Sequence, residues 1–240
     1  YYKGQPIAVT SVSDMRRQLS AISREVFSST PRIHNELINR HKPSGTIVNS
    51  RKKLLMGILE RHGSPELVTV PTTPDASMFR TILVHTGLYR DNGDGSCGYV
   101  SGKTNSLPED HGLKETWNRL REFFEVPSDA PKRPRELLDA LVAPPFGIRR
   151  GLLPIFFGAG MKAFGKAISL RNGHDYVADI LPSVVEDLCR NPDGYELEVL
   201  ALDSQTDEYF ATVRDVFGGS SRLDLDTDPV PPPSDAIQCW

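Results

Sequence analysis

The string most like a catalytic motif in this chain is an imperfect phosphate-binding loop. Cys97-Gly98-Tyr99-Val100-Ser101-Gly102-Lys103-Thr104 nearly follows the P-loop pattern, with Cys97 where the first glycine belongs. A P-loop needs a buried strand before it and a helix directly after it, so that backbone N–H groups cradle the phosphate. Here a predicted hairpin precedes the string and Leu107-Pro108 interrupts it soon afterwards. We therefore expect no ATP site and no cofactor.

Residue sets for metal-dependent or hydrolytic chemistry are incomplete. His34 and Glu36 have the H-x-E spacing of a zinc deaminase, but the P-C-x-x-C half of that motif is missing. Asp193, Glu196 and Glu198 could supply the acids of a nuclease strand, yet no lysine follows them. The G-x-S-x-G string of esterases is also missing. The sequence predicts a protein that is not an enzyme and holds no metal.

Basic side chains are concentrated between Arg32 and Arg61, where seven of them face only two glutamates. Three fall in the first half of a predicted helix, where a helix-turn-helix protein places side chains that meet the DNA groove and backbone. The residues that we expect to contact double-stranded DNA here are Arg40, Lys42, Arg51, Lys52 and Lys53. A helix face that is merely solvated is the alternative interpretation.

A second basic patch begins at Arg149 and Arg150, which we add to the expected nucleic-acid contacts. No acidic residue occurs between residues 140 and 174. The patch opens a predicted helix, Ile148 to Phe164, whose apolar face is too wide for a surface helix. That helix is expected to be mainly core, or else an interface with a missing neighbour.

Composition sets the class of protein. The 240 residues are 38% hydrophobic and 25% charged, which is typical of a soluble globular protein. Three cysteines are too few for a disulfide scaffold. The longest uncharged apolar stretch, Gly151 to Met161, falls short of the roughly 20 residues of a membrane span. With no signal peptide at the start, we expect a cytoplasmic fragment of a larger protein, without a membrane partner.

Charge is divided unevenly along the chain. Its net value is −3, but residues 1–166 carry +8 and residues 167–240 carry −11. Such asymmetry suggests two surfaces with separate electrostatic roles. Two differently solvated surfaces would also explain it.

Helices dominate the predicted first half. Met15, Leu19, Ile22 and Val26 form one apolar stripe behind a Ser13 cap. Further helices are predicted from Pro31, over 45–62, over 74–87 and from about residue 111. Between the last two, residues 88–90 and 97–100 flank an Asn-Gly pair, which predicts a β-hairpin.

The second half repeats this scheme. Helices are predicted over residues 137–141 and 148–164, followed by a hairpin around Asn172-Gly173. A helix at 182–190, a strand at 195–201 and a helix at 204–217 follow.

The order of these elements, helices that lead into a hairpin, is the order found in a winged helix. The prediction is therefore an α+β, mainly helical fold with winged-helix-like units at 1–126 and 132–217 and an acidic, Pro-rich tail or linker at 218–240. Any small α+β domain with hairpins shares these elements.

A longer pattern resembles a known class of protein. It includes Asn35-Glu36-Leu37-Ile38-Asn39-Arg40, Thr86-Gly87-Leu88-Tyr89-Arg90, Trp117 and Ala143-Pro144-Pro145-Phe146-Gly147-Ile148-Arg149-Arg150-Gly151. The chain is similar here to the accessory region that follows the ATPase core in large bacterial P-loop ATPases associated with phage defence, of the BREX-like type. The resemblance implies winged-helix-like domains that contact DNA or partner subunits. The ATPase core itself is missing from this sequence, and the resemblance transfers no functional residue.

Two functions follow as expectations. The first is a non-catalytic DNA-engaging module of a larger antiviral-defence ATPase, which contacts the phosphate backbone through a basic helix. The alternative is a protein-interaction scaffold that docks an ATPase or partner subunit and has no affinity for DNA.

Overall fold

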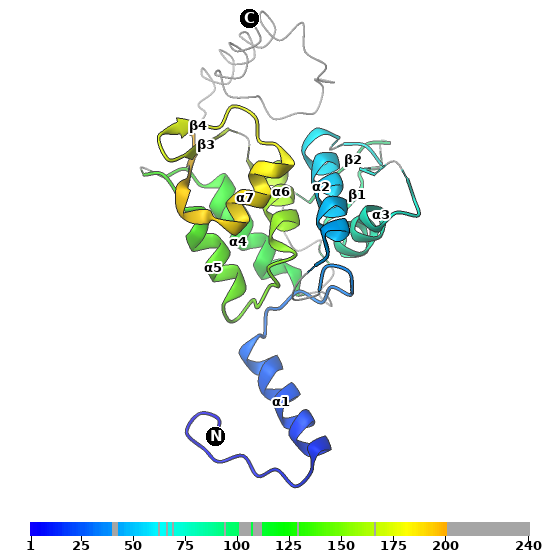
Figure 1. Cartoon of the computed structure of the whole chain (residues 1–240), viewed down its shortest axis with the longest axis vertical. Coiled ribbons are helices and arrows are strands. Elements are labelled where there is room, and N and C mark those ends of the chain that lie inside the picture. The colour runs from blue at the N-terminus through cyan, green and yellow to red at the C-terminus, as the bar shows by residue number, and fades with distance from the viewer. Residues whose placement is uncertain are drawn as a thin grey trace, which may run out of the picture.

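The centre of the molecule is helix α6 (Leu153–Phe164), which is buried along almost its whole length. The computed structural model describes residues 1–39, 43–61, 63–65, 67–68, 70–93, 95–100, 107, 112–128, 130–165 and 167–200. Helices α2 (Gly45–Glu60), α4 (Leu113–Glu125) and α7 (Pro182–Arg190) pack around α6 (Figure 1). The fold is α+β and mainly helical, as the sequence predicts.

Small residues let two helices approach α6 closely. A Cβ added to Gly158 would lie 3.1 Å from Leu55 Cδ2 of α2, and one added to Gly160 would lie 3.2 Å from Leu120 Cβ of α4. Helix α6 is therefore core, and the alternative that its apolar face docks a missing neighbour is wrong, because this chain covers it. Although apolar, α6 is short, and none of the helices that the structure describes could cross a membrane.

The buried apolar side chains form one cluster, which extends from Ile33 to Val199. It includes Leu137, Leu138 and Leu141 of helix α5 (Pro134–Val142). The linker predicted near residues 127–131 thus runs beside a shared core, and the two winged-helix units are not confirmed. In a winged helix, the helix just before the hairpin is the one that contacts DNA, and it exposes one face. Helix α6 is the helix just before the second hairpin, but it is buried. The predicted boundaries of units 1–126 and 132–217 remain predictions, and residues 201–240 lie outside the described residues.

Both Asn-Gly hairpins are confirmed. Strands β1 (Tyr89–Asp91) and β2 (Cys97–Tyr99) pair antiparallel, with Tyr89 opposite Tyr99. The second sheet has the order β4-β3-β5, all antiparallel. Its strands are β3 (Ile168–Asn172), β4 (Asp175–Tyr176) and β5 (Tyr195–Val199).

Some predicted elements differ. The helix expected from Pro31 is a turn, because Asn35 Oδ1 accepts hydrogen bonds from the N–H groups of Leu37 at 3.1 Å and Ile38 at 3.3 Å, in competition with helical bonding. The helix predicted from Ile148 begins only at Leu153. The helix that starts at Pro74 is α3 (Pro74–Met78), which continues as the π-helix η1 (Phe79–Val84). A short 3-10 turn, η4 (Pro192–Gly194), precedes β5.

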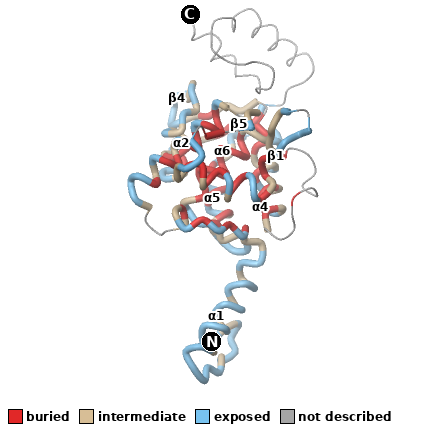
Figure 2. Tube along the Cα trace, turned by 90° about the vertical axis from the view of Figure 1, so that its right-hand side faces the viewer, coloured by how far each residue is buried: buried red, intermediate tan, exposed pale blue. Residues whose placement is uncertain are grey.

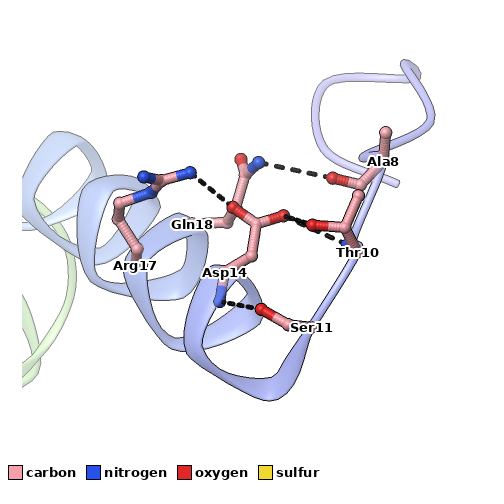
Figure 3. Close-up of polar contacts among 6 residues, drawn as sticks. All are labelled: Ala8, Thr10, Ser11, Asp14, Arg17 and Gln18. Carbon is pink, nitrogen blue, oxygen red and sulfur yellow. Dashed lines mark hydrogen bonds and ion pairs between the residues drawn. The ribbon is translucent and has the colours of Figure 1, made fainter.

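Helix α1 (Val12–Val26) projects from the rest of the fold and contains no buried residue (Figures 1 and 2). Its cap is Ser11 and not Ser13 as predicted. Ser11 Oγ accepts the Asp14 N–H at 3.0 Å, and the Asp14 carboxylate accepts hydrogen bonds from Thr10 and Arg17 (Figure 3). The bond from the Thr10 backbone, with help from Arg17, lowers the pKa of Asp14. Local bonding therefore secures the start of α1 without support from the core.

Candidate functional site

An open groove of about 1070 Å³ lies where the end of α1 meets the body of the molecule. Its wall includes the segment after α1, the turn before α6 and the end of α7. Six arginines line it, whereas Glu186 is its single acidic residue among those that the structure describes. The arginines are Arg24, Arg32, Arg51, Arg149, Arg150 and Arg190.

Arg51 forms the floor of this groove, inside the protein. Its Nε and Nη2 atoms donate to the two carboxylate oxygens of Glu186, both at 2.6 Å, and its Nη1 donates to the Gly151 carbonyl at 3.0 Å. The two side chains are only 9% and 5% exposed. This two-point ion pair ties α2 to α7 and to the turn before α6. The predicted contact of Arg51 with DNA stays a prediction, and this geometry argues against it, because the charge is buried and neutralised by Glu186.

A local signal for this burial exists in the sequence. Arg51 lies four residues after Ile47 and three before Leu54, which places all three on one side of α2. Ile47 and Leu54 are both buried. An arginine on the apolar side of a helix needs an internal carboxylate, and Glu186 provides it.

Burial disfavours the thiolate form of the thiol beside this ion pair. Cys189 also lines the groove, and burial raises the pKa of its thiol, with the Glu186 carboxylate acting in the same direction. A thiol that stays protonated at neutral pH is a poor nucleophile. Cys189 is therefore a weak candidate for a nucleophile.

The turn before α6 carries Arg149 and Arg150 to the rim of the groove. Gly147, with φ +62°, shapes this turn, and a Cβ there would lie 2.5 Å from Cδ1 of Phe27. The Ile148 N–H then bonds to the Leu141 carbonyl at 2.8 Å. Both arginines are consequently exposed and precede α6, although the sequence predicted them on that helix.

The two neighbouring arginines differ in their contacts. The Arg149 guanidinium donates to the backbone carbonyl of Asn39 across the groove. The Arg150 side chain makes no hydrogen bond or ion pair with any residue that the structure describes. Arg150 is therefore the freer of the two to meet an anion.

Two further rim arginines come from helix ends, and sequence reasoning missed both. Arg24 lies in the last turn of α1 and Arg190 in the last turn of α7. Both are exposed, and neither pairs with another described residue. Arg32 belongs to the basic stretch that the sequence indicates, although it is not among the predicted DNA contacts, and it is exposed on the segment after α1.

The other residues predicted to contact DNA are not among the described residues that line the groove. Lys52 is partly exposed and Lys53 is exposed on α2, and neither lines the groove. Arg40 and Lys42 lie outside the described residues, although their neighbours Asn39 and Pro43 line the groove. Of the seven predicted residues, the groove thus brings together Arg51, Arg149 and Arg150.

Two of the three acids considered for a nuclease strand, Asp193 and Glu198, are engaged with arginines. The Asp193 carboxylate pairs with Arg135, which lowers the pKa of Asp193, and Glu198 lies 3.3 Å from Arg171. No group of three or more His, Cys, Asp or Glu side chains that could hold a metal ion occurs within the described ranges. The arrangement that the structure offers for function is the arginine-lined groove.

Comparisons of this chain with protein-family models, with curated proteins and with solved structures find no match.

Proposed function

We propose that this chain binds the phosphate backbone of nucleic acid, double-stranded DNA in the first instance, through the arginine-lined groove. The observation that supports the proposal most is the convergence of Arg24, Arg150 and Arg190. These three exposed guanidinium groups lie on one groove, come from distant parts of the chain and are not paired with described residues. Guanidinium groups suit phosphate because their planar forks donate two hydrogen bonds at once.

The electrostatics of the groove support the same function. Glu186, the single carboxylate among the described residues of the wall, is neutralised by Arg51. The rim arginines therefore meet an incoming anion on a wall whose described carboxylate is already neutralised. Phosphate contacts of this kind give affinity without sequence specificity.

A non-catalytic role within a larger assembly is part of the proposal. The described residues supply cationic contacts to the groove, and no group of three or more metal-ligating side chains occurs among them. Membership of a phage-defence ATPase rests on the resemblance described above, and the groove is equally suited to other nucleic-acid machines.

The test is a fluorescence-anisotropy titration of a labelled duplex at about 50 and about 200 mM salt. The wild-type protein should bind at low salt and lose most of its affinity at high salt. The combined variant Arg24→Gln, Arg150→Gln and Arg190→Gln should bind weakly, and its slope of log affinity against log salt should fall by about three.

A control variant removes the same amount of charge elsewhere. Lys52→Gln, Lys53→Gln and Arg133→Gln change three side chains outside the groove wall. This control should keep the wild-type affinity. Equal losses in both variants would mean that overall charge and not the groove binds DNA. A loss in the control alone would restore the basic face of α2 as the contact surface.

A protein-interaction scaffold is the second candidate function. The exposed apolar stripe of α1 favours it, because a soluble protein normally covers such a stripe. Absence of duplex binding even at low salt would leave this function as the better one.

A further inference from the structure

The apolar stripe of α1 is uncovered. Val12, Met15, Leu19, Ile22 and Val26 follow one another at alternating spacings of three and four residues, yet none of them is buried. Val12 is 65% exposed, Met15 42% and Leu19 53%. These spacings are those of the a and d positions of a coiled coil. A seam of this kind is narrower than the face with which a helix packs on a globular core.

The rest of α1 holds this seam in place. A helix of 15 residues is only marginally stable in water by itself. Here the Ser11 and Asp14 cap secures one end (Figure 3). At the other end, Phe27 packs over Gly147, and the Ser29 N–H bonds to the Pro145 carbonyl at 3.1 Å. The helix therefore projects from the body, as Figures 1 and 2 show, and no residue of its seam is buried.

We propose that α1 pairs with α1 of a second copy of this chain. An a/d seam is self-complementary, because each helix offers the same apolar knobs and the same holes to receive them. The positions that flank the seam carry Arg16 and Ser23 on one side and Gln18 and Glu25 on the other. Since Glu25 is also paired with Lys3, no row of like charges opposes the approach of a second copy.

The shape of the molecule makes the pair antiparallel. Packed helix axes lie about 8–10 Å apart, whereas the body at the end of α1 is several helices wide (Figure 1). In a parallel pair the two bodies would occupy the same space. An antiparallel pair places them at opposite ends, with Leu19 facing Ile22 of the second copy and Met15 facing its Val26.

The pair should be weak and reversible. Two helices of 15 residues bury less than the roughly 1,200 Å² of a standard stable interface. We therefore expect a dissociation constant in the micromolar range or weaker.

Sedimentation equilibrium without nucleic acid tests the pair. Between roughly 1 and 300 µM, the wild-type protein should shift from its 26.6 kDa monomer towards twice that mass. Leu19→Lys should weaken association at least about tenfold, because it places a charge in the seam. Ser20→Lys adds the same charge at the next exposed position, off the seam, and should associate like the wild type.

Because no residue of α1 is buried, both variants should keep the circular dichroism spectrum and unfolding midpoint of the wild type. A wild-type protein that stays monomeric throughout, even if α1 binds some other protein, would overturn the proposal. Equal association of the Leu19→Lys and wild-type proteins would overturn it as well.

Cross-linking tests the orientation. Met15→Cys and Val26→Cys proteins are mixed and oxidised, and the disulfide-linked peptides are identified by mass spectrometry. The antiparallel pair predicts a mixed disulfide between positions 15 and 26. Disulfides that join only identical positions would contradict it.

Discussion

Arg51 and Arg150 line the same groove and have opposite roles. Arg51 is buried and bonded through two of its nitrogens to Glu186, whereas Arg150 is exposed and has no partner among the described residues. A buried guanidinium must be neutralised inside the protein, while an exposed one is available to a mobile anion. The role of a basic residue therefore depends on whether its side chain faces the core or the solvent. The number of charged residues nearby in the sequence does not reveal which of the two holds.

The largest expected effect comes from breaking the buried ion pair. Arg51→Ala should lower the free energy of unfolding by about 3–5 kcal/mol, because the Glu186 carboxylate is then left buried and unpaired. Denaturant titration followed by circular dichroism measures this loss. Lys53→Ala, on the exposed side of the same helix, should change the unfolding free energy by less than about 0.5 kcal/mol.

A double variant separates the effect of an unpaired buried charge from the effect of lost side-chain volume. Arg51→Met with Glu186→Leu removes both charges, so it should recover most of the stability that Arg51→Ala loses. If Arg51→Ala instead lost less than about 1 kcal/mol, the pair would be solvated and Arg51 would be available to phosphate after all.

The next effect concerns the turn that carries Arg150. Gly147→Ala should cost about 1–2 kcal/mol for the positive φ, and more because the new Cβ meets Phe27. Gly173→Ala is a matched control, since its φ is +61° and nothing lies within 4 Å of an added Cβ. Thermal or denaturant unfolding of both variants gives the difference.

That difference should disappear in a Phe27→Ala background, because the ring is then no longer in the way. Equal losses for Gly147→Ala and Gly173→Ala in the wild-type background would show that Phe27 moves aside without cost. The end of α1 would then be loosely attached to the groove.

Much of the fold could be predicted because its signals are local. The hairpins at Asn92-Gly93 and Asn172-Gly173 follow from turn chemistry, and α7 begins at Pro182, a residue that suits the first helical position. The short helix predicted from Pro31 does not form, because the Asn35 side chain accepts a hydrogen bond from the Leu37 N–H and this bond competes with helical bonding. The order of elements resembled two winged helices, but order alone does not reveal that α6 is shared by both halves of the core.

The groove was harder to predict. Arg24, Arg150 and Arg190 share no spacing or motif, and only the fold places the end of α1, the turn before α6 and the end of α7 on one groove. The basic run 51–53 is a stronger local signal, but the structure does not bring its three side chains together on the groove. Its first residue points inward with Ile47 and Leu54, and its other two lie away from the groove wall. Helical periodicity applied to charged residues, as well as to apolar ones, would have identified Arg51 as internal.

The smallest effect on stability, and the clearest on function, is expected for Arg150→Gln. The side chain is exposed and unpaired with described residues, so the unfolding free energy should change by less than about 0.5 kcal/mol. If Arg150 neutralises one phosphate, the slope of log affinity against log salt should fall by about one in anisotropy titrations. Lys53→Gln removes one exposed positive charge outside the groove wall and should leave that slope unchanged. A stability loss above about 1 kcal/mol in Arg150→Gln would assign this arginine a structural role like that of Arg51, and an equal drop in slope for Lys53→Gln would show that binding follows net charge alone.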